Sequence, residues 1–219
     1  MKNMIKKTIF LIAFLSAASL SFADNYLDFG MVLGGLNDRF PDDAYKRSQI
    51  GFHGNFAYYF FPSASDFGLF AQIAVGGSSP QSEEIPRESM SARKASIFDL
   101  RTVAAPSYRL QLGVKAFFYA SLGPIFIFTY ENSTEKLVSG STEYNYQSLS
   151  GGIQGNFSFA FVFFSGFVIR TGISLDSLFL RAEKGEMRMN YRTTHNDHFK
   201  GARYYTFGFD LFFCLGFKF

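Results

Sequence analysis

Three histidines are the side chains whose type and spacing come closest to a metal or acid–base site. His195 and His198 are separated by two residues, and on a helix this spacing places two imidazoles where they can share a metal ion. No third ligand lies nearby, so we expect a solvated loop, with no metal and no cofactor.

Nucleophilic hydrolysis would need a serine, a histidine and an acid that converge. His53 lies in the middle of an alternating apolar segment and is expected to be a hydrogen-bonded interior residue, so we predict no catalytic residues and no enzyme activity.

Isolated charged residues recur on the less apolar side of several segments. Four are acids and three are bases: Asp28, Asp99, Asp176, Asp210, Arg101, Lys115 and Arg170. Charges inside a fold need partners, because an isolated buried charge is costly or changes its protonation. The near balance of acids and bases predicts an ion-pair network that plugs the interior. The functional alternative is a polar path through which a small solute or ion passes.

The elements that carry these charges are predicted to be strands, because apolar residues recur at every second position. The C-terminal segment is the clearest example. One side carries Phe207, Phe209, Leu211, Phe213, Leu215, Phe217 and Phe219, and the other carries Thr206, Gly208, Asp210, Phe212, Cys214, Gly216 and Lys218. The same alternation recurs within residues 50–60, 112–122, 157–163 and 167–179.

The two faces of these strands differ in a way that favours lipid over water. One face is rich in phenylalanine, of which the chain has 30, and only 18% of all residues are charged, against about 25% in soluble domains. The other face is mostly small or weakly polar, which suits a narrow lumen better than an open water face. We therefore interpret the phenylalanine face as lipid-facing, with a soluble barrel or sandwich as the alternative.

These patterns predict an all-β fold, an eight-stranded antiparallel up-and-down transmembrane β-barrel. The expected strands are residues 25–35, 49–61, 67–77, 95–105, 111–130, 144–163, 167–182 and 200–219. Their connections alternate between long polar segments at 36–48, 78–94, 131–143 and 183–199 and short segments at 62–66, 106–110 and 164–166. In outer-membrane barrels long connections lie outside and short ones in the periplasm, which places both termini in the periplasm. An even strand number also lets the first strand pair with the last.

The N-terminus predicts export. Lys2, Lys6 and Lys7 precede an apolar stretch and then Ser21, Phe22 and Ala23, which is the pattern of a secretory signal peptide. We expect residues 1–23 to be removed by a cut after Ala23, which leaves residues 24–219 as the barrel domain.

Removal of this segment changes the charge balance. Residues 1–23 hold three lysines and no acids, so the remaining chain has 21 − 3 = 18 basic and 18 acidic residues. A formal charge of zero gives no electrostatic support for a nucleic-acid partner. Cys214 is the only cysteine, which excludes an intramolecular disulfide.

The final strand resembles a known signal. Phe219, Phe217 and Leu215, spaced by two, look like the C-terminal signal that the bacterial barrel assembly machinery reads. Together with eight strands, this is similar to the small outer-membrane barrels of the OmpA, OmpX and OmpW type. The resemblance implies insertion from the periplasm and location in the outer membrane, with outer-membrane lipid and the assembly machinery as partners.

The role of such a barrel stays open at the level of the sequence. A structural or surface-interaction protein with a filled lumen is our first expectation, and an extracellular ligand would bind through the four long connections. A narrow pore or transporter for small solutes or hydrophobic molecules is the second. A lipid-processing enzyme is the third.

Overall fold

The computed structural model describes residues 23–39, 46–62, 65–84, 94–137, 140–189, 192–200 and 205–219. Within these ranges the chain forms nine strands. They are β1 (Ala23–Arg39), β2 (Lys46–Pro62), β3 (Phe67–Glu84), β4 (Lys94–Gln111), β5 (Ala116–Leu137), β6 (Gly140–Val162), β7 (Phe167–Met189), β8 (Arg192–Lys200) and β9 (Tyr205–Lys218). The described residues include no helix that is long and apolar enough to cross a membrane.

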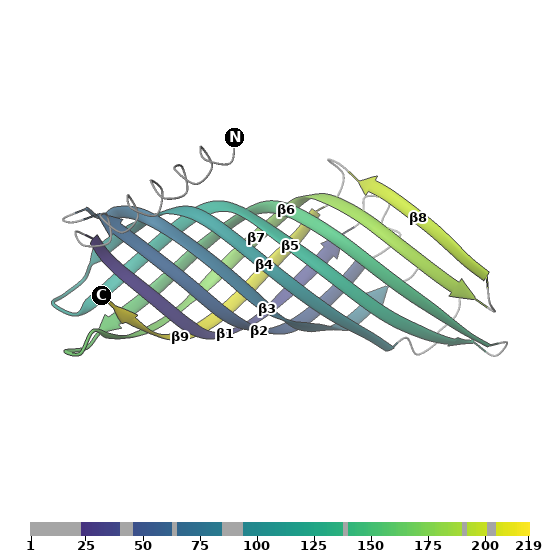
Figure 1. Cartoon of the computed structure of the whole chain (residues 1–219), viewed down its shortest axis with the longest axis horizontal. Helices are drawn as coiled ribbons and strands as arrows, with labels where there is room; N and C mark the ends of the chain where they lie inside the picture. Colours follow the sequence, from purple (N-terminus) through teal and green to yellow (C-terminus); the bar gives the residue numbers. More distant parts are fainter. Residues whose placement is uncertain are drawn as a thin grey trace, which may run out of the picture.

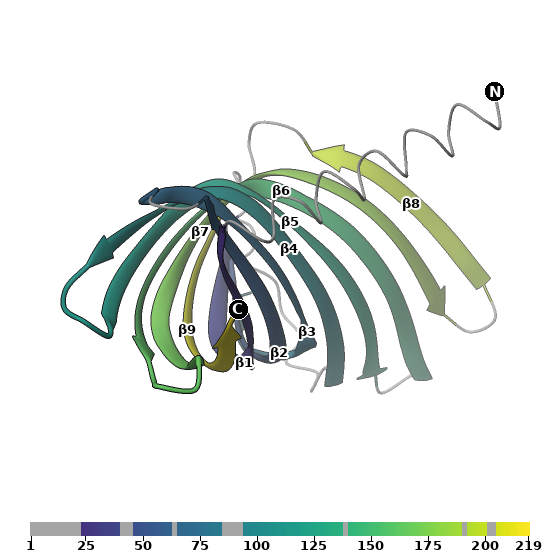
Figure 2. The same ribbon diagram turned by 60° about the vertical axis from the view of Figure 1, so that its left-hand side comes forward.

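All neighbouring strands are antiparallel, and the sheet closes on itself (Figure 1). Strands β1 to β7 pair in chain order, and β9 lies between β7 and β1. Strand β8 pairs with the distal half of β7, from Arg181 to Met189, whereas β9 pairs with its proximal half, from Phe167 to Leu178. The short strands β8 and β9 therefore lie one after the other along β7 and share one position in the barrel wall. The nine strands thus fill the eight strand positions that the sequence predicts. In Figure 2, β8 extends beyond the barrel wall together with the end of β7.

The register fixes the tilt of the strands. A path from each residue to its paired residue on the next strand starts at Asp28 and leads once around the barrel. It passes through Ala57, Gln72, Val103, Ile125, Gly152, Leu178 and Thr206 and ends at Asp38. The path returns to β1 ten residues further along (38 − 28). A closed sheet can accommodate such a stagger only if its strands tilt, typically by about 35–45°. The strands in Figure 1 cross the long axis obliquely.

The outer face of the barrel is apolar at every strand position around the wall. Along β9, burial alternates residue by residue, and the exposed side chains are Phe207, Phe209, Leu211, Phe213, Leu215 and Phe217. The last apolar residues before the outer face becomes polar are Ile50, Phe98, Tyr130, Leu149 and Tyr205. A contiguous apolar band around a closed sheet is a surface for acyl chains, so the phenylalanine side does face outward, as predicted.

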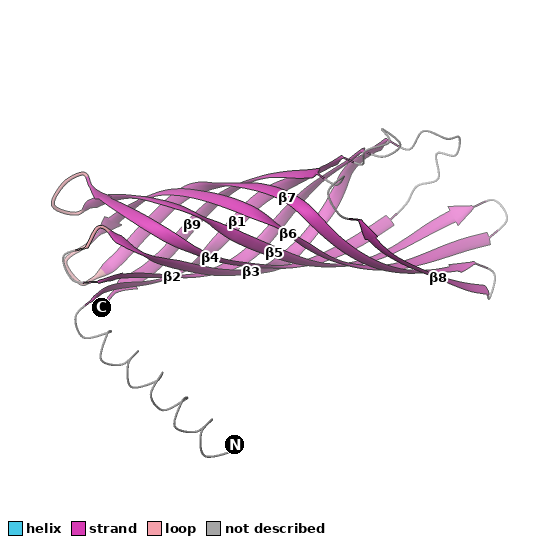
Figure 3. Ribbon diagram, turned by 90° about the horizontal axis from the view of Figure 1, so that it is seen from above, coloured by secondary structure: helices cyan, strands magenta, loops and turns pink. Residues whose placement is uncertain are grey.

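The short turns lie together at one end of the barrel, and the strand extensions with β8 lie at the other (Figure 3). The short turns join β2 to β3, β4 to β5 and β6 to β7. The predicted turn at 106–110 is wrong, because β4 continues to Gln111 and the turn spans residues 112–115. The turn was predicted at this position because of Pro106. Proline cannot donate to the sheet ladder, and the β4–β5 pairing is interrupted between Val103 and Ser107 but then resumes.

The strands are longer at the opposite end than predicted. Most of the expected connection 131–143 is strand, since β5 runs to Leu137 and β6 begins at Gly140. The segment 183–199 is largely the β7–β8 hairpin, and 36–48 and 78–94 lose residues to strands at both ends. Beyond the lipid band the outer face of a strand meets water instead of acyl chains, so the apolar alternation ends although the backbone pairing continues. The sequence pattern therefore marked the edge of the lipid band and missed the true strand ends.

Candidate functional site

The lumen near the short-turn end is closed by an arginine among tyrosines. Arg170 of β7 is fully buried and pairs through Nε with the carboxylate of Asp28 on β1. Its guanidinium carbon lies 3.9 Å from the ring centroid of Tyr59 and 4.1 Å from that of Tyr119. These contacts combine a buried ion pair with cation–π attraction, which is strongest where water is excluded. We call Arg170, Asp28, Tyr26, Tyr59 and Tyr119 the arginine plug.

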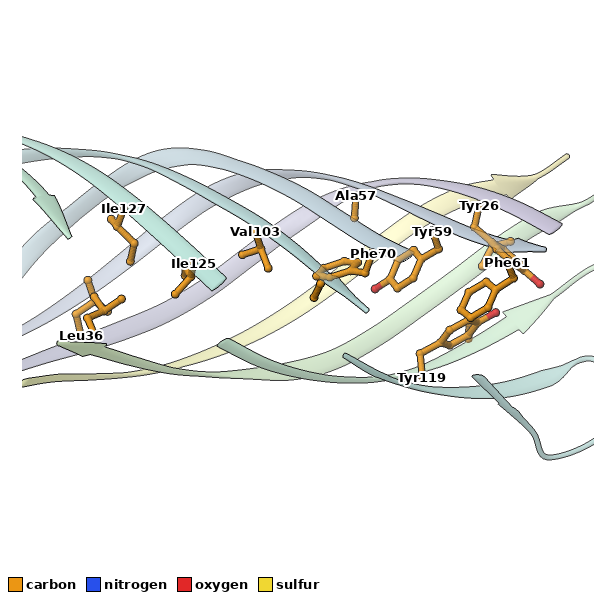
Figure 4. Close-up of a cluster of buried hydrophobic side chains, with 14 residues drawn as sticks. Tyr26, Leu36, Ala57, Tyr59, Phe61, Phe70, Val103, Tyr119, Ile125 and Ile127 are labelled. Carbon is orange, nitrogen blue, oxygen red and sulfur yellow. The ribbon is translucent and has the colours of Figure 1, made fainter. Parts of the chain in front are cut away.

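Small residues on the neighbouring strands make room for the plug. Arg170 is paired in register with Ala160 of β6 and Cys214 of β9. Asp28 is paired with Gly216, where a Cβ would collide with its carboxylate. Long side chains can therefore reach across the axis from β1, β2, β5 and β7, as Figure 4 shows for Tyr26, Tyr59 and Tyr119. Their rings pack with Phe61 and Phe70 in one buried cluster.

A second arginine lies at the rim of this end. Arg109 of β4 donates to the carboxylate of Asp24 at 2.6 Å and to the backbone carbonyl of Ser65 at 3.2 Å, and it stacks on Phe61 at 4.7 Å. Lys218 also contacts Asp24, at 2.8 Å. Sequence reasoning missed Arg109 because it was assigned to a turn. Its position two residues after the inward Ser107 would have identified it as an inward residue had the strand been continued.

Another charged cluster lies further along the lumen. Arg101 of β4 donates through Nη1 to both carboxylate oxygens of Asp210 on β9, at 3.0 and 2.9 Å. The same nitrogen is 3.9 Å from Asp176 of β7, whose other oxygen accepts a hydrogen bond from Gln154 at 2.8 Å. Gly34 faces Asp210, and a Cβ there would overlap its carboxylate. One guanidinium thus serves two buried carboxylates, and we call Arg101, Asp176 and Asp210 the arginine–aspartate triad.

The third cluster brings a serine, a histidine and an acid together. His53 Nε2 lies 3.4 Å from Asp99 Oδ2, and the hydroxyl of Ser78 donates to the same oxygen at 2.8 Å. Thr129 donates to Asp99 Oδ1 at 2.9 Å. Nucleophilic catalysis needs the serine to donate to the histidine. Here both donate to the acid, and all three are buried, so this set orders the lumen and does not activate a nucleophile.

The structure places six of the seven predicted charged residues in the lumen. Asp28 and Arg170 meet in the plug, Arg101, Asp176 and Asp210 meet in the triad, and Asp99 meets His53. The assignment of Lys115 is wrong. It lies in the 112–115 turn, half-buried, with its Nζ 3.0 Å from the ring centroid of Phe164. The predicted strand 111–130 ran through the turn at 112–115, whereas β5 begins at Ala116.

The described lumen carries more acid than base. Its buried carboxylates at the level of the lipid band are Asp28, Asp99, Asp176 and Asp210, against the two guanidinium groups of Arg101 and Arg170. Several buried polar atoms have no hydrogen-bond partner within the described protein, including Gln72 Oε1, Asn156 Oδ1 and Asp176 Oδ2. A polar atom of this kind is satisfied when water reaches it. The middle of the lumen is therefore polar, whereas the short-turn end is packed with rings.

Beyond the lipid band the lumen continues between the strand extensions. Arg181 and Glu183 form an ion pair there, and Arg181 donates to the hydroxyl of Tyr146 at 3.3 Å. Burial raises the pKa of the Tyr146 phenol above its usual value, although Arg181 opposes this, so the ring stays neutral. A bulge on β7 opposite Gly151 and Gly152 leaves Phe179 without a partner in the register, and it turns Arg181 and Glu183 inward. The side chains of His195 and His198 lie outside the described residues, but their backbone is part of strand β8, so the helix that their metal site would need is absent there.

Comparison with known proteins supports the fold. Neither a protein-family model nor a curated protein matches the sequence. The structure is similar to a major outer membrane protein from Thermus thermophilus, with a TM-score of 0.63 and 9% identity over 87% of this chain and 99% of that chain. It is also similar to the outer membrane protein OprG from Pseudomonas aeruginosa, with a TM-score of 0.54 and 12% identity over 90% of this chain and 96% of that chain.

A third similar structure is the outer membrane protease OmpT from Escherichia coli, with a TM-score of 0.51 and 8% identity over 90% of this chain and 97% of that chain. At such low identity these likenesses establish the fold. The predicted all-β, eight-stranded barrel is confirmed, and with its apolar outer band the chain has the architecture of a bacterial outer-membrane barrel.

Proposed function

We propose that the chain is a closed outer-membrane barrel with a structural and surface-interaction role. It carries no through-going path and holds strand extensions outside the membrane. The observation that carries the proposal is the arginine plug, in which Arg170 contacts Tyr59, Tyr119 and Asp28 across the lumen axis. Eight strands enclose a space that side chains can fill, and Arg109 closes the rim below. The short-turn end then lies in the periplasm, and the extensions lie outside.

An extracellular ligand is the partner that this architecture would serve. Strands β5 and β6 pair up to Leu137 and Gly140, well beyond Tyr130 and Leu149, where the described apolar band of the outer face ends. A paired extension is a rigid platform, and binding residues commonly lie where a stable scaffold presents variable segments. In this proposal, the long connections predicted from the sequence are the outer tips of strand hairpins, and the ligand binds at these tips.

Planar-bilayer recording tests whether the lumen is closed. We expect purified barrels inserted into a bilayer to give no single-channel steps in simple salt solution, because rings and a guanidinium occupy the axis near the short-turn end. Membrane insertion must be verified in parallel by protection of the strands from protease. Steady steps from verified inserted barrels would contradict the proposal.

The second candidate function is a narrow path for small cations. It is favoured by the polar middle of the described lumen, with four buried carboxylates against two guanidinium groups and several polar atoms without a hydrogen-bond partner. If the plug opens, this segment would attract cations and exclude anions. The same recordings decide between the two, since a path of this kind gives steps with a reversal potential displaced toward the cation in a salt gradient.

Assembly in the cell provides a separate prediction. Phe219 is exposed on the outer face, and its backbone exchanges hydrogen bonds with Asn25 at 3.2 and 3.0 Å. Phe219→Ala keeps that backbone pairing, so we expect folding into detergent micelles to be nearly unchanged. We expect assembly in the outer membrane to fall several-fold, as the resemblance to the C-terminal assembly signal implies. The measurement is the amount of heat-modifiable barrel in membrane fractions.

The matched control is Phe209→Ala. Phe209 is also an exposed phenylalanine of β9, but it lies outside the terminal residues that resemble the signal. Equal assembly of the two variants would remove the special role of the C-terminus.

A further inference from the structure

Two short turns at one end of the barrel form a single surface. Residues 112–115 join β4 to β5, and residues 163–166 join β6 to β7. Because β5 lies beside β6, the turns are neighbours, and the backbone N–H of Val162 donates to the carbonyl of Lys115 at 2.9 Å. Each turn is also closed internally, by Leu112 N–H to the Ala116 carbonyl at 2.9 Å and by Gly166 N–H to the Phe163 carbonyl at 3.0 Å. The tips of both turns are therefore held in fixed positions.

Both tips are apolar and exposed. Phe164 is 95% exposed and Val114 is 90% exposed. Gly166 has a φ of 75°, a left-handed conformation that glycine adopts without strain, and the turn that it closes leaves Phe164 projecting. The first residues of the two turns, Leu112 and Phe163, and Phe161 of β6 are also exposed. The tips thus continue the lipid-facing band beyond the ends of the strands.

A lysine completes this surface. Lys115 Nζ lies 3.0 Å from the ring centroid of Phe164. Among the residues that the structure describes, no carboxylate pairs with Lys115, whereas Arg109 and Lys218 at the same end both contact Asp24. A lysine whose stem lies on apolar surface keeps its ammonium at the level of lipid headgroups. The combination provides a cation for a phosphate and apolar groups for the adjoining acyl chains.

We propose that the turns 112–115 and 163–166 bind an anionic phospholipid of the adjacent leaflet. The ammonium of Lys115 contacts the negatively charged phosphate and headgroup of the lipid. Phe164 and Val114 contact the part of the acyl chains that lies next to the glycerol. This site goes beyond the closed-barrel role, and it stands whether or not the lumen conducts. It gives the barrel a preferred lipid at one place on its circumference.

Tryptophan fluorescence can test the site, because the chain contains no tryptophan. Phe164→Trp introduces a single reporter at the turn. The variant is reconstituted into phosphatidylcholine vesicles that contain a small fraction of brominated phosphatidylglycerol or, in a parallel sample, brominated phosphatidylcholine. Both leaflets have the same composition, so the orientation of the barrel does not affect the result. Lipid selectivity is the ratio of the two association constants derived from quenching.

We expect brominated phosphatidylglycerol to associate about fivefold more strongly than brominated phosphatidylcholine, because one lysine near an anionic membrane surface contributes about 1 kcal/mol. High salt should reduce this ratio toward one. The added substitution Lys115→Gln should abolish it while leaving overall quenching by lipid intact. Val114→Trp should give the same selectivity from the neighbouring turn and serves as the second reporter if the first variant folds poorly.

Phe67→Trp is the matched control. Phe67 is 70% exposed beside Tyr108 at the same end of the barrel, and among the described residues no cation stacks on it. It should be quenched equally by both lipids. Equal quenching at Phe164→Trp and Val114→Trp, selectivity that survives Lys115→Gln, or a reporter open to aqueous acrylamide and untouched by brominated lipid would each overturn the proposal.

Discussion

Replacing Arg170 with alanine should both destabilise the barrel and open its lumen. Asp28 is fully buried and pairs with Arg170, so the variant leaves a carboxylate without its cation inside the protein. Breaking a buried pair in this way costs about 3–5 kcal/mol. Tyr59 and Tyr119 also lose the guanidinium that lies 3.9 and 4.1 Å from their ring centroids. We expect the free energy of unfolding in detergent to fall by this amount, and single-channel steps to appear in bilayers where the unsubstituted barrel gives none.

The matched control separates lost charge balance from lost volume. Arg170→Met with Asp28→Asn removes both charges while retaining much of the side-chain volume, so most of the stability should return. The lumen of this double variant should also stay closed, because methionine still lies among the three tyrosines. If the double variant is as unstable as Arg170→Ala, then packing on the rings, and not the ion pair with Asp28, dominates the energetics of the plug.

The fold could be predicted from the sequence because lipid imposes a regular demand. Every second residue of a lipid-facing strand must be apolar, and the pattern from Phe207 to Phe217 therefore identified both the strand and its outward side. The same rule also placed Arg101, Arg170 and Asp210 in the lumen. It fails where lipid ends. Lys115 lies in the turn, where the alternation no longer reports direction, whereas Arg109 still follows it and was missed because a turn was predicted at 106–110. The extensions of β5 and β6 carry no apolar alternation.

The partners of each lumen charge could not be predicted for a different reason. Arg101 on β4 meets Asp210 on β9, which is 109 positions away in sequence. The stagger of a barrel decides which inward residues meet across its lumen. The ten-residue stagger (38 − 28) is known only when the pairing of strands is known all the way around the barrel. Alternation gives each strand its faces but leaves the register between strands open. The network was therefore predictable as a set of charges and unpredictable as a set of pairs.

The arginine–aspartate triad predicts an asymmetry between its members. Arg101 contacts Asp210 at 2.9 Å and Asp176 at 3.9 Å, and all three side chains are almost fully buried. Arg101→Met leaves two carboxylates without a cation, so we expect a loss of at least about 3–5 kcal/mol in the free energy of unfolding. Asp176→Asn has the opposite character. It leaves one acid paired with one base, and its amide oxygen can still accept the hydrogen bond that Gln154 donates at 2.8 Å.

We therefore expect Asp176→Asn to be neutral or stabilising, although it removes a buried charge from a charged cluster. Chemical unfolding of the single variants and of Arg101→Met with Asp176→Asn gives a double-mutant cycle. In the double variant one of the two orphaned carboxylates is gone, so it should be more stable than Arg101→Met alone. If Asp176→Asn instead costs as much as Arg101→Met, then the Asp176 carboxylate is balanced by a positive charge other than Arg101. The excess of acid in the lumen would then be a binding site for a cation, and the path for small cations would become the better account of this barrel.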